Sequence, residues 1–336
     1  MPGPLLLAAV IVAAGLIACL GTRALIPLLR RAAVLDHPNE RSSHEAPTPR
    51  GGGIAPVAAI LFAWLALIAA GVSAPLLLIV LFGAALLAAI SWIDDLRGMS
   101  PAMRLAAQFV AVCLGMIAAM PAGPVFQGWL MPGLDTLAAG LLWLWFVNLF
   151  NFMDGIDGLA GSEAAAIAIG LVLCSGFDAG RDPGLAVLAA TTAAAMLGFL
   201  VWNWAPARIF LGDVGSVPLG YLLGFLLLDV AARGGWQVAL ILPLYFLADA
   251  TLTLVRRLAR GERVWQAHRQ HFYQRAVQRG LTHAAVVRRV IAADLLLIVC
   301  GWAAANGWGI AALAVAAIVV AALLASLAGG WRRRAT

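Results

Sequence analysis

Long apolar runs separated by short polar stretches make up most of the chain. Each run holds about 20 residues, the length that lets a helix cross the roughly 30 Å apolar core of a bilayer. We predict about eleven membrane-spanning helices, or about ten because the fourth and sixth runs are short. The predicted spans cover residues 4–27, 53–71, 75–93, 105–120, 134–152, 160–176, 184–202, 214–232, 236–255, 288–305 and 308–328.

The composition supports the same interpretation. The chain has 336 residues, of which 63% are hydrophobic and 11% are charged, and its mean hydropathy is +0.95. A soluble protein of this size carries far more charge on its surface. We therefore predict an all-α, polytopic helical bundle that forms one membrane-embedded domain over residues 1–336.

The basic residues predict how the bundle lies in the membrane. All 22 are arginines, and they fall mostly in alternate loops. Short loops rich in arginine stay in the cytoplasm. We thus predict a periplasmic N-terminus and a cytoplasmic C-terminus, which agrees with an odd number of spans. The net charge of +6 is explained by this distribution and by attraction to anionic lipid or phosphate groups, and not by binding to nucleic acid.

Nearly all the remaining polar residues lie in the loops predicted to be cytoplasmic. These loops cover residues 28–52, 94–104, 150–162, 203–214 and 256–287. The outer loops, such as GVSAP at 71–75, are short and ordinary. Loops at one end of a helical bundle lie close together, so we predict that these form a single site facing the cytoplasm.

The inner loops carry aspartates that are candidate ligands for a metal ion, namely Asp94, Asp95, Asp154, Asp157 and Asp213. Neighbouring carboxylates repel one another unless a cation, a proton or an arginine lies between them. Mg²⁺ takes one or two protein carboxylates and completes its shell with phosphate and water, and Mn²⁺ accepts the same ligands. For any single aspartate, a helix N-cap is the alternative.

One loop, NLFNFMDGIDGLAG at 148–161, places a polar residue at every third position: Asn148, Asn151, Asp154 and Asp157. In a helix, this spacing keeps neighbouring members on roughly one face. Such a stripe is costly in a chain this apolar unless it faces a ligand. We interpret it as part of the site.

Glycines and arginines add features typical of phosphate binding. Gly51, Gly52 and Gly53 precede the second span, and a glycine-flanked Asp213 opens the eighth. Backbone N–H groups at glycine can approach an anion, although a flexible turn is the alternative. Arg50 and other inner arginines are candidate phosphate ligands or simple topology anchors. Carboxylates beside such cations indicate phosphoryl transfer.

Histidines concentrate in the last inner loop, where HRQH at 268–271 places His268 and His271 three residues apart. A zinc pair is conceivable, but no third nitrogen or sulfur ligand lies at a familiar spacing. Binding of a diphosphate by histidine and arginine is the favoured interpretation. A solvated basic helix is the alternative.

Together these loops resemble the polyprenyl-phosphate N-acetylhexosamine-1-phosphate transferase family (glycosyltransferase family 4). The matching stretches occur in the family's order, between about residues 36 and 280: RSSHEAPTPRGGG, DDLRGMSPAMRLAAQ, NLFNFMDGIDGLAG, FLGDVGS and AHRQHFYQR. The resemblance implies Mg²⁺-dependent transfer of HexNAc-1-phosphate from a UDP-HexNAc to undecaprenyl phosphate, with release of UMP. It also implies a site on the cytoplasmic face of the bacterial inner membrane and a role in starting O-antigen or a related cell-surface glycan.

The resemblance further implies roles for single residues. The position of the magnesium-binding aspartate is matched by Asp213, and the group that serves both metal and catalysis includes Asp157. Positions near the nucleotide are matched by Asn151, Asp154, Asn203 and Phe210, the last as the aromatic ring on which uracil stacks. The pair near the lipid phosphate is matched by Asp94 and Asp95, and whether Asp94 acts as a base is left open. Candidates for holding the diphosphate or choosing the sugar are Arg50, His268, Arg269 and His271.

The histidine loop departs from that of the phospho-MurNAc-pentapeptide translocase, which carries consecutive histidines there. We therefore expect a donor such as UDP-GlcNAc or a modified N-acetylhexosamine. A transporter for an anionic solute is the main alternative, but the chain shows no internal repeat of the kind transporters carry. An alcohol phosphotransferase that uses a CDP-linked substrate would group its aspartates in one compact stretch. A homodimer is left open.

Overall fold

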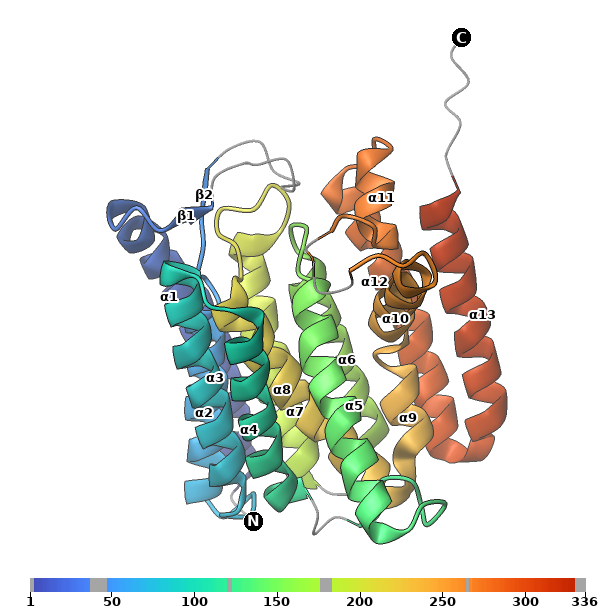
Figure 1. The fold of residues 1–336 in the computed structure, drawn as a ribbon. Coiled ribbons are helices and arrows are strands. Elements are labelled where there is room, and N and C mark those ends of the chain that lie inside the picture. Colours follow the sequence, from blue (N-terminus) through green and yellow to red (C-terminus); the bar gives the residue numbers. More distant parts are fainter. Residues whose placement is uncertain are drawn as a thin grey trace.

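The computed structural model describes residues 3–36, 47–119, 123–175, 183–263, 266 and 268–329. Within them, helices run along a common direction and form a bundle (Figure 1). These helices are α1 (Pro4–Arg31), α2 (Ile54–Ala69), α3 (Leu77–Arg97), α4 (Pro101–Ala119), α5 (Pro132–Phe152), α6 (Leu159–Ser175), α7 (Pro183–Asn203), α8 (Asp213–Val230), α9 (Trp236–Ile241), α12 (His283–Ala303) and α13 (Gly309–Ala328). Two short strands, β1 (Leu35–Asp36) and β2 (Thr48–Pro49), pair antiparallel.

The predicted apolar spans coincide with these helices, which confirms a polytopic helical membrane protein. Among the described residues, seven helical stretches are long and apolar enough to cross a membrane, and α2 and α6 are shorter apolar helices. Two of the seven contain a turn, at Gly234 and at Gly307, where φ is +95° and +97°. Because glycine tolerates this left-handed backbone, the chain reverses there. The turns separate α8 from α9 and α12 from α13.

The ninth predicted span, 236–255, is wrong as a single straight helix. In the structure α9 ends at Ile241, and α10 (Leu244–Ala259) begins after Pro243. Proline lacks a backbone N–H and clashes with the preceding turn, so a helix bends or ends there. Figure 1 shows α10 nearly end-on, whereas α9 follows the bundle. α10 therefore turns away from the bundle and leads toward the short helix α11 (Phe272–Gln278).

The predicted inner loops are shorter in the structure than in the sequence interpretation. α3 continues to Arg97 and α4 begins at Pro101, so most of the predicted loop 94–104 is helical. Gly98 ends α3 with a φ of +70°. Residues 37–46 of the predicted loop 28–52 lie outside the described residues, as do the C-terminal arginines used to predict topology, Arg332, Arg333 and Arg334.

The centre of the bundle is α8, whose residues are almost all buried. α3 and α5 pack along it. Tyr221 of α8 stacks on Trp143 of α5 with 4.7 Å between ring centroids, and Nε1 of Trp143 donates to the Tyr221 carbonyl at 2.9 Å. A helix that is apolar on every side needs neighbours all round it. The N-terminal residue of α8, Asp213, is thereby held on a rigid element.

Residues 50–53 pack closely on the N-terminal end of α8. The backbone N–H groups of Gly52 and Gly53 donate to the carbonyls of Phe210 and Leu211, both at 2.8 Å. A Cβ atom on Gly53 would lie 2.2 Å from the Cα of Gly215. These two N–H groups are therefore not free to bind an anion, which was one interpretation of the GGG sequence. Here the glycines allow two backbones to touch.

Replacement of Gly53 by alanine tests this contact. We expect Gly53→Ala to destabilise the fold by about 1–3 kcal/mol, the usual cost of forcing a methyl group into packed atoms. The control is Gly133→Ala in the first turn of α5, where nothing lies within 4 Å of an added Cβ. Thermal unfolding in detergent measures both variants. Equal melting temperatures would contradict the packing role.

Candidate active site

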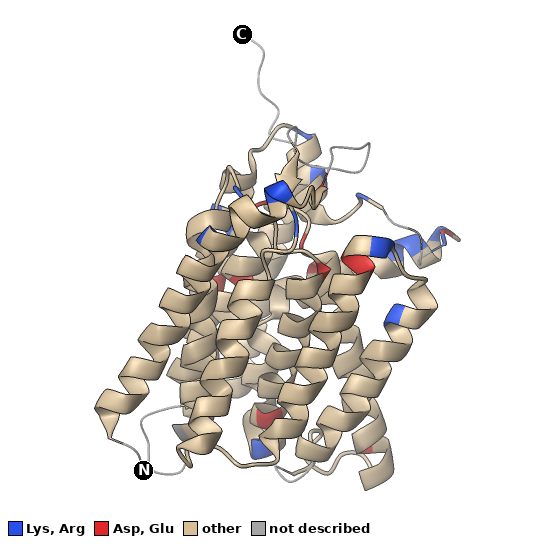
Figure 2. Ribbon diagram, turned by 90° about the vertical axis from the view of Figure 1, so that its left-hand side faces the viewer, with Lys and Arg blue, Asp and Glu red and all other residues tan. Residues whose placement is uncertain are grey.

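Charged residues gather at one end of the bundle, opposite the end where α1 begins (Figure 2). The last turns of α3, α5 and α7 and the first turns of α6, α8 and α12 are next to the loops predicted to form one site. The structure brings these elements together through the ion pairs and hydrogen bonds described below.

Arg50 and Arg104 bind three aspartates of the site. Nη2 of Arg50 lies 2.5 Å from Oδ1 of Asp95 and 3.3 Å from Oδ1 of Asp213. Nη1 of Arg104 lies 3.2 Å from Oδ2 of Asp94 and 3.6 Å from Oδ2 of Asp213. Asp213 is thus held between two guanidinium groups, and each of these also neutralises one member of the Asp94–Asp95 pair.

The fully buried side chain of Asp95 lies at the N-terminal end of α8. Its Oδ2 accepts a hydrogen bond from the backbone N–H of Val214 at 3.3 Å. The first amides of a helix lack carbonyl partners and favour negative charge. A Cβ on Gly212, whose φ is +73°, would lie 3.0 Å from Oδ2 of Asp95. The glycine in FLGD therefore leaves room for this carboxylate.

The polar repeat at the end of α5 is helical only in its first half, because α5 ends at Phe152. Nδ2 of Asn148 donates to Oε1 of Gln108 at 2.7 Å. Oγ of Ser216, on α8, donates to Oδ1 of Asn151 at 2.6 Å. The repeat therefore binds α5 to α4 and α8 before the chain enters the loop with Asp154 and Asp157.

A cavity of about 210 Å³ opens beside Asp213, between α3, α4, α5 and α8. Arg104, Gln108, Asn148 and Asn151 line it together with apolar residues of the same helices. A guanidinium group and side-chain amides are donors for phosphate or carbonyl oxygens. This cavity can therefore take an anionic group next to Asp213.

Asp154 lies in the loop between α5 and α6 and is half-buried. The pKa of its carboxyl group is raised to about 7, first by loss of hydration and then by the negative charges of Asp213, Asp95 and Asp157, against the opposing effect of Arg50. Like charges that disfavour ionisation also favour a bound cation. The loop thus places a carboxyl group where added positive charge would be stabilising.

Asp157 and Asn203 connect three loops of the site. Oδ2 of Asp157 accepts from the backbone N–H of Ala207 at 3.0 Å, and Nδ1 of His283 lies 3.3 Å from its Oδ1. Oδ1 of Asn203 accepts from the N–H of Gly158 at 3.1 Å, and its Nδ2 donates to the carbonyl of Ile209 at 2.9 Å. Both side chains fix the loops 153–158 and 204–212 against each other.

Within the described part of the chain, no three histidine, cysteine or acidic side chains lie together as a ready-made metal site. Asp213 and Asp157, predicted as metal ligands, are instead held by arginines and by His283. Mg²⁺ needs only one or two protein carboxylates when phosphate supplies the rest. The negative charges that act on Asp154 fit such a cation, and Asp213 is the partly accessible carboxylate among them.

The histidine loop is arranged differently from an open diphosphate site. His271 is buried, and its Nδ1 lies 3.2 Å from Oδ1 of Asp249 on α10. His268 packs against it with 4.8 Å between ring centroids. Gln278 donates to the carbonyl of Arg269 at 3.0 Å. Phe210 is half-buried, with its backbone paired to Arg50 and to Pro49.

The structure adds Ser216 and His283, which the sequence interpretation did not select, and singles out Arg104 among the inner arginines treated as phosphate ligands or topology anchors. Arg104 and Ser216 contact Asp213 and Asn151 directly, and His283 contacts Asp157. Arg104 follows Asp94 by ten residues, a spacing that brings them together only because Gly98 turns the chain between two helices. His283 comes from the start of α12, far along the chain, where no local pattern signals the contact.

Comparison with known proteins identifies relatives over this region. A model described as glycosyl transferase family 4 matches residues 77–231. A phospho-N-acetylmuramoyl-pentapeptide-transferase of a Synechococcus species is 33% identical over 64% of this chain and 67% of the relative. A decaprenyl-phosphate N-acetylglucosaminephosphotransferase of Mycobacterium tuberculosis is 31% identical over 77% of this chain and 73% of the relative. The chain belongs to glycosyl transferase family 4.

This membership confirms the family expected from the loop motifs. A probable undecaprenyl-phosphate N-acetylglucosaminyl 1-phosphate transferase of Bacillus subtilis is 27% identical over 81% of this chain and 79% of the relative. The chain spans only 58% of the length of the phospho-N-acetylmuramoyl-pentapeptide-transferase of Synechococcus elongatus. The names of the relatives describe enzymes and not the transporter that was the main alternative.

The Arg50 contacts predict a specific loss of stability. We expect Arg50→Gln to cost about 1–3 kcal/mol, because it leaves the buried Asp95 carboxylate without its cationic partner. Arg97→Gln removes an exposed arginine two residues after Asp95 and serves as the control. Thermal unfolding in detergent compares the two. If both variants melt alike, Arg50 does not hold this site together.

Proposed function

We propose that this protein transfers an N-acetylhexosamine-1-phosphate group from a UDP-N-acetylhexosamine to a polyprenyl phosphate and releases UMP. The observation that carries the proposal is Asp213, held between Arg50 and Arg104 beside a crowded group of carboxyls at one end of the bundle. Relatives named as polyprenyl-phosphate N-acetylglucosamine phosphotransferases support the reaction class. Undecaprenyl phosphate is the carrier we propose.

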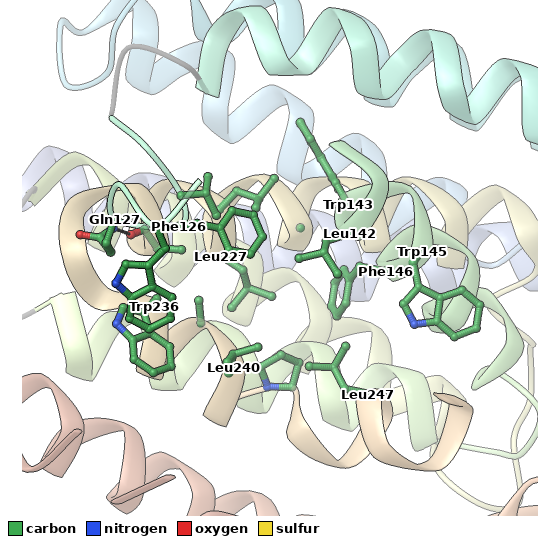
Figure 3. Close-up of a pocket in the computed structure, with 17 residues that line it drawn as sticks. Phe126, Gln127, Leu142, Trp143, Trp145, Phe146, Leu227, Trp236, Leu240 and Leu247 are labelled. Atoms are coloured by element: carbon green, nitrogen blue, oxygen red, sulfur yellow. Dashed lines mark hydrogen bonds between the residues drawn. The ribbon is translucent and has the colours of Figure 1, made fainter. Parts of the chain in front are cut away.

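A second cavity is lined mostly by apolar side chains and would suit a lipid chain. It measures about 250 Å³ and lies between α5, α8, α9 and α10. Figure 3 shows Leu142 and Phe146 from α5, Leu240 from α9 and Leu247 from α10 around it. Phe146 precedes Asn151 by five residues of helix, a distance of about 8 Å at 1.5 Å per residue. A prenyl chain in this cavity would therefore bring its phosphate to the site.

The proposed reaction needs little activation of the nucleophile. The second pKa of a phosphate monoester is about 6, so the carrier phosphate is largely ionised at neutral pH. Its oxygen attacks the phosphorus that bears the sugar, and the bond from that phosphorus to the oxygen bridging to UMP breaks. The contribution of the protein is then positioning and charge neutralisation. Arg50 and Arg104 are placed to neutralise phosphate oxygens, and Asp94 and Asp95 to orient these arginines.

Mg²⁺ or Mn²⁺ bound at Asp213, with Asp157 nearby, would neutralise the diphosphate of the donor. Asn151 and Asp154 would lie near the nucleotide, together with Asn203 as a loop anchor. We extend the proposal to a cytoplasm-facing site in the bacterial inner membrane, on the basis of the arginine distribution. The initiating step of O-antigen or a related cell-surface glycan is the biological role we propose.

Release of UMP tests the function directly. Purified protein is incubated with undecaprenyl phosphate, Mg²⁺ and a series of UDP-N-acetylhexosamines, and UMP is measured with and without lipid. We expect UMP only with lipid, and Asp213→Asn to lower the rate by at least about a hundredfold, as for other groups that stabilise developing charge.

The matched control is Asp229→Asn, which changes an aspartate that pairs with Arg233 at the far end of α8. This variant should keep the wild-type rate. Chelation of divalent cations should stop the reaction, and added Mg²⁺ or Mn²⁺ should restore it. UMP release that is independent of lipid, or a fully active Asp213→Asn variant, would refute the proposed function.

A further inference from the structure

Asp249 is a fully buried aspartate on α10 that the proposed reaction does not use. Its two carboxyl oxygens are surrounded by donors from two elements. On α10 itself, the hydroxyl groups of Tyr245 and Thr253 each lie 3.3 Å away. The other donors come from the segment that begins α11. An acid placed in this way binds one element to another.

At the start of α11, the carboxyl group of Asp249 accepts the backbone N–H groups of Phe272 at 3.0 Å and Tyr273 at 3.3 Å. Burying backbone N–H groups without an acceptor would cost free energy. The contact therefore explains how a short helix of seven residues, preceded by a loop, is fixed against the bundle.

The same carboxyl group also contacts the side chain of His271. Nδ1 of His271 lies 3.2 Å from Oδ1 of Asp249. The contact joins the His271 ring to the carboxyl group of α10, with the donor and acceptor roles at Nδ1 set by the tautomer of the ring. In the neighbouring His268, Nδ1 accepts from the N–H of Gln270 at 3.3 Å. Burial lowers the pKa of His268 to about 4, as do the nearby His271 and Arg257, so this ring is neutral at pH 7.

From α11 the contact continues to the carboxylate loop of the site. Oη of Tyr273 donates to the carbonyl of Phe152 at 3.1 Å. A Cβ on Gly155 would lie 2.2 Å from the same Oη, so the tyrosine occupies the space beside this glycine. Gly155 stands between Asp154 and Asp157. Any shift of α11 would therefore be transmitted to the loop that carries both acids.

We propose that Asp249 is the positioning residue of this site: it locks His271 and α11, and through Tyr273 it fixes the loop of Asp154 and Asp157 for binding of the nucleoside diphosphate donor. The inference rests on the proposed function and names a residue that acts through others. Other ionisable groups near this contact are Glu163 on α6 and Asp294 on α12, whose charges act on Tyr245.

The test compares Asp249→Asn with Asp135→Asn. Asp135 is also a buried carboxylate that accepts two backbone N–H groups, those of Val125 at 2.9 Å and Phe126 at 2.8 Å, but at the opposite end of α5. The measurements are UMP release at varied UDP-sugar and at varied polyprenyl phosphate, together with the melting temperature. Both variants lose one buried carboxylate, so stability alone does not separate them.

For Asp249→Asn we expect kcat/KM for the UDP-sugar to fall about ten- to hundredfold, the range seen when a group that orients a functional histidine is removed. KM for the polyprenyl phosphate should not change, because the cavity proposed for its chain is lined on this side by Pro243 and Leu247 and not by Asp249 or α11. At saturating polyprenyl phosphate, Asp135→Asn should leave kcat/KM for the UDP-sugar unchanged, because its partners Val125 and Phe126 line only the cavity proposed for the lipid. Equal losses in the two variants, or a loss in Asp249→Asn confined to the lipid, would overturn the inference.

Two further variants complete the test, and the first of them, which keeps Asp249, keeps the test decisive if Asp249→Asn does not fold. Tyr273→Phe removes only the hydroxyl group that reaches Phe152, and it should lower kcat/KM for the UDP-sugar about two- to tenfold. Replacing His271 by glutamine in the Asp249→Asn background should add little to the loss, because both act in one unit. An unaffected Tyr273→Phe, or fully additive losses, would refute the inference. Failure of the proposed function would show differently, as a wild-type protein that releases no UMP in response to lipid.

Discussion

Negative charge at the edge of an apolar bundle must be neutralised, and the ion pairs around Asp213 satisfy this constraint. Asp213 begins the fully packed helix α8, so its position is set by the core of the protein. Arg50 pairs with one of its carboxylate oxygens and Arg104 with the other, and at the same time they hold Asp95 and Asp94. Without these contacts, the ends of α3 and α8 would bring like charges together at the boundary of a low-dielectric region. The packing of residues 50–53 on α8 therefore also places Arg50 where it neutralises Asp95 and Asp213.

The sequence alone predicted the features that depend on neighbouring residues along the chain. Apolar runs of membrane length predicted nearly every helix, because burial in lipid or in the bundle requires continuous apolar surface. The loops with Asp94, Asp95, Asp154, Asp157 and Asp213 were predicted to converge, since helices of similar length return to the same end. Ion pairs through Arg50 and Arg104 connect Asp94, Asp95 and Asp213. The break before α10 was missed, although Pro243 signals it, because the apolar run continues across the proline.

Contacts between distant segments could not be predicted in this way. Asn203 was assigned to the nucleotide, yet the structure commits its amide to Gly158 and Ile209. His271 was assigned to the diphosphate and is instead buried against Asp249. Both assignments treated polar side chains in a loop as free to meet a ligand. In a compact site, most of them are needed to hold loops to one another, because loop backbone groups lack helical partners. Selecting the free ones requires the three-dimensional contacts.

The chemistry proposed for the site explains why most of its polar side chains hold loops and only a few are free to bind substrate. To transfer a phosphoryl group between two anionic substrates, the protein chiefly needs positive charge and side chains held in fixed positions. Asp213 would hold a divalent cation, which would supply positive charge beside the donor diphosphate. Arg50 and Arg104, which already lie at this carboxylate, would supply further positive charge to phosphate oxygens. Rigid loops are then the remaining requirement, and Asn203, His283 and Asp249 supply them from three different elements.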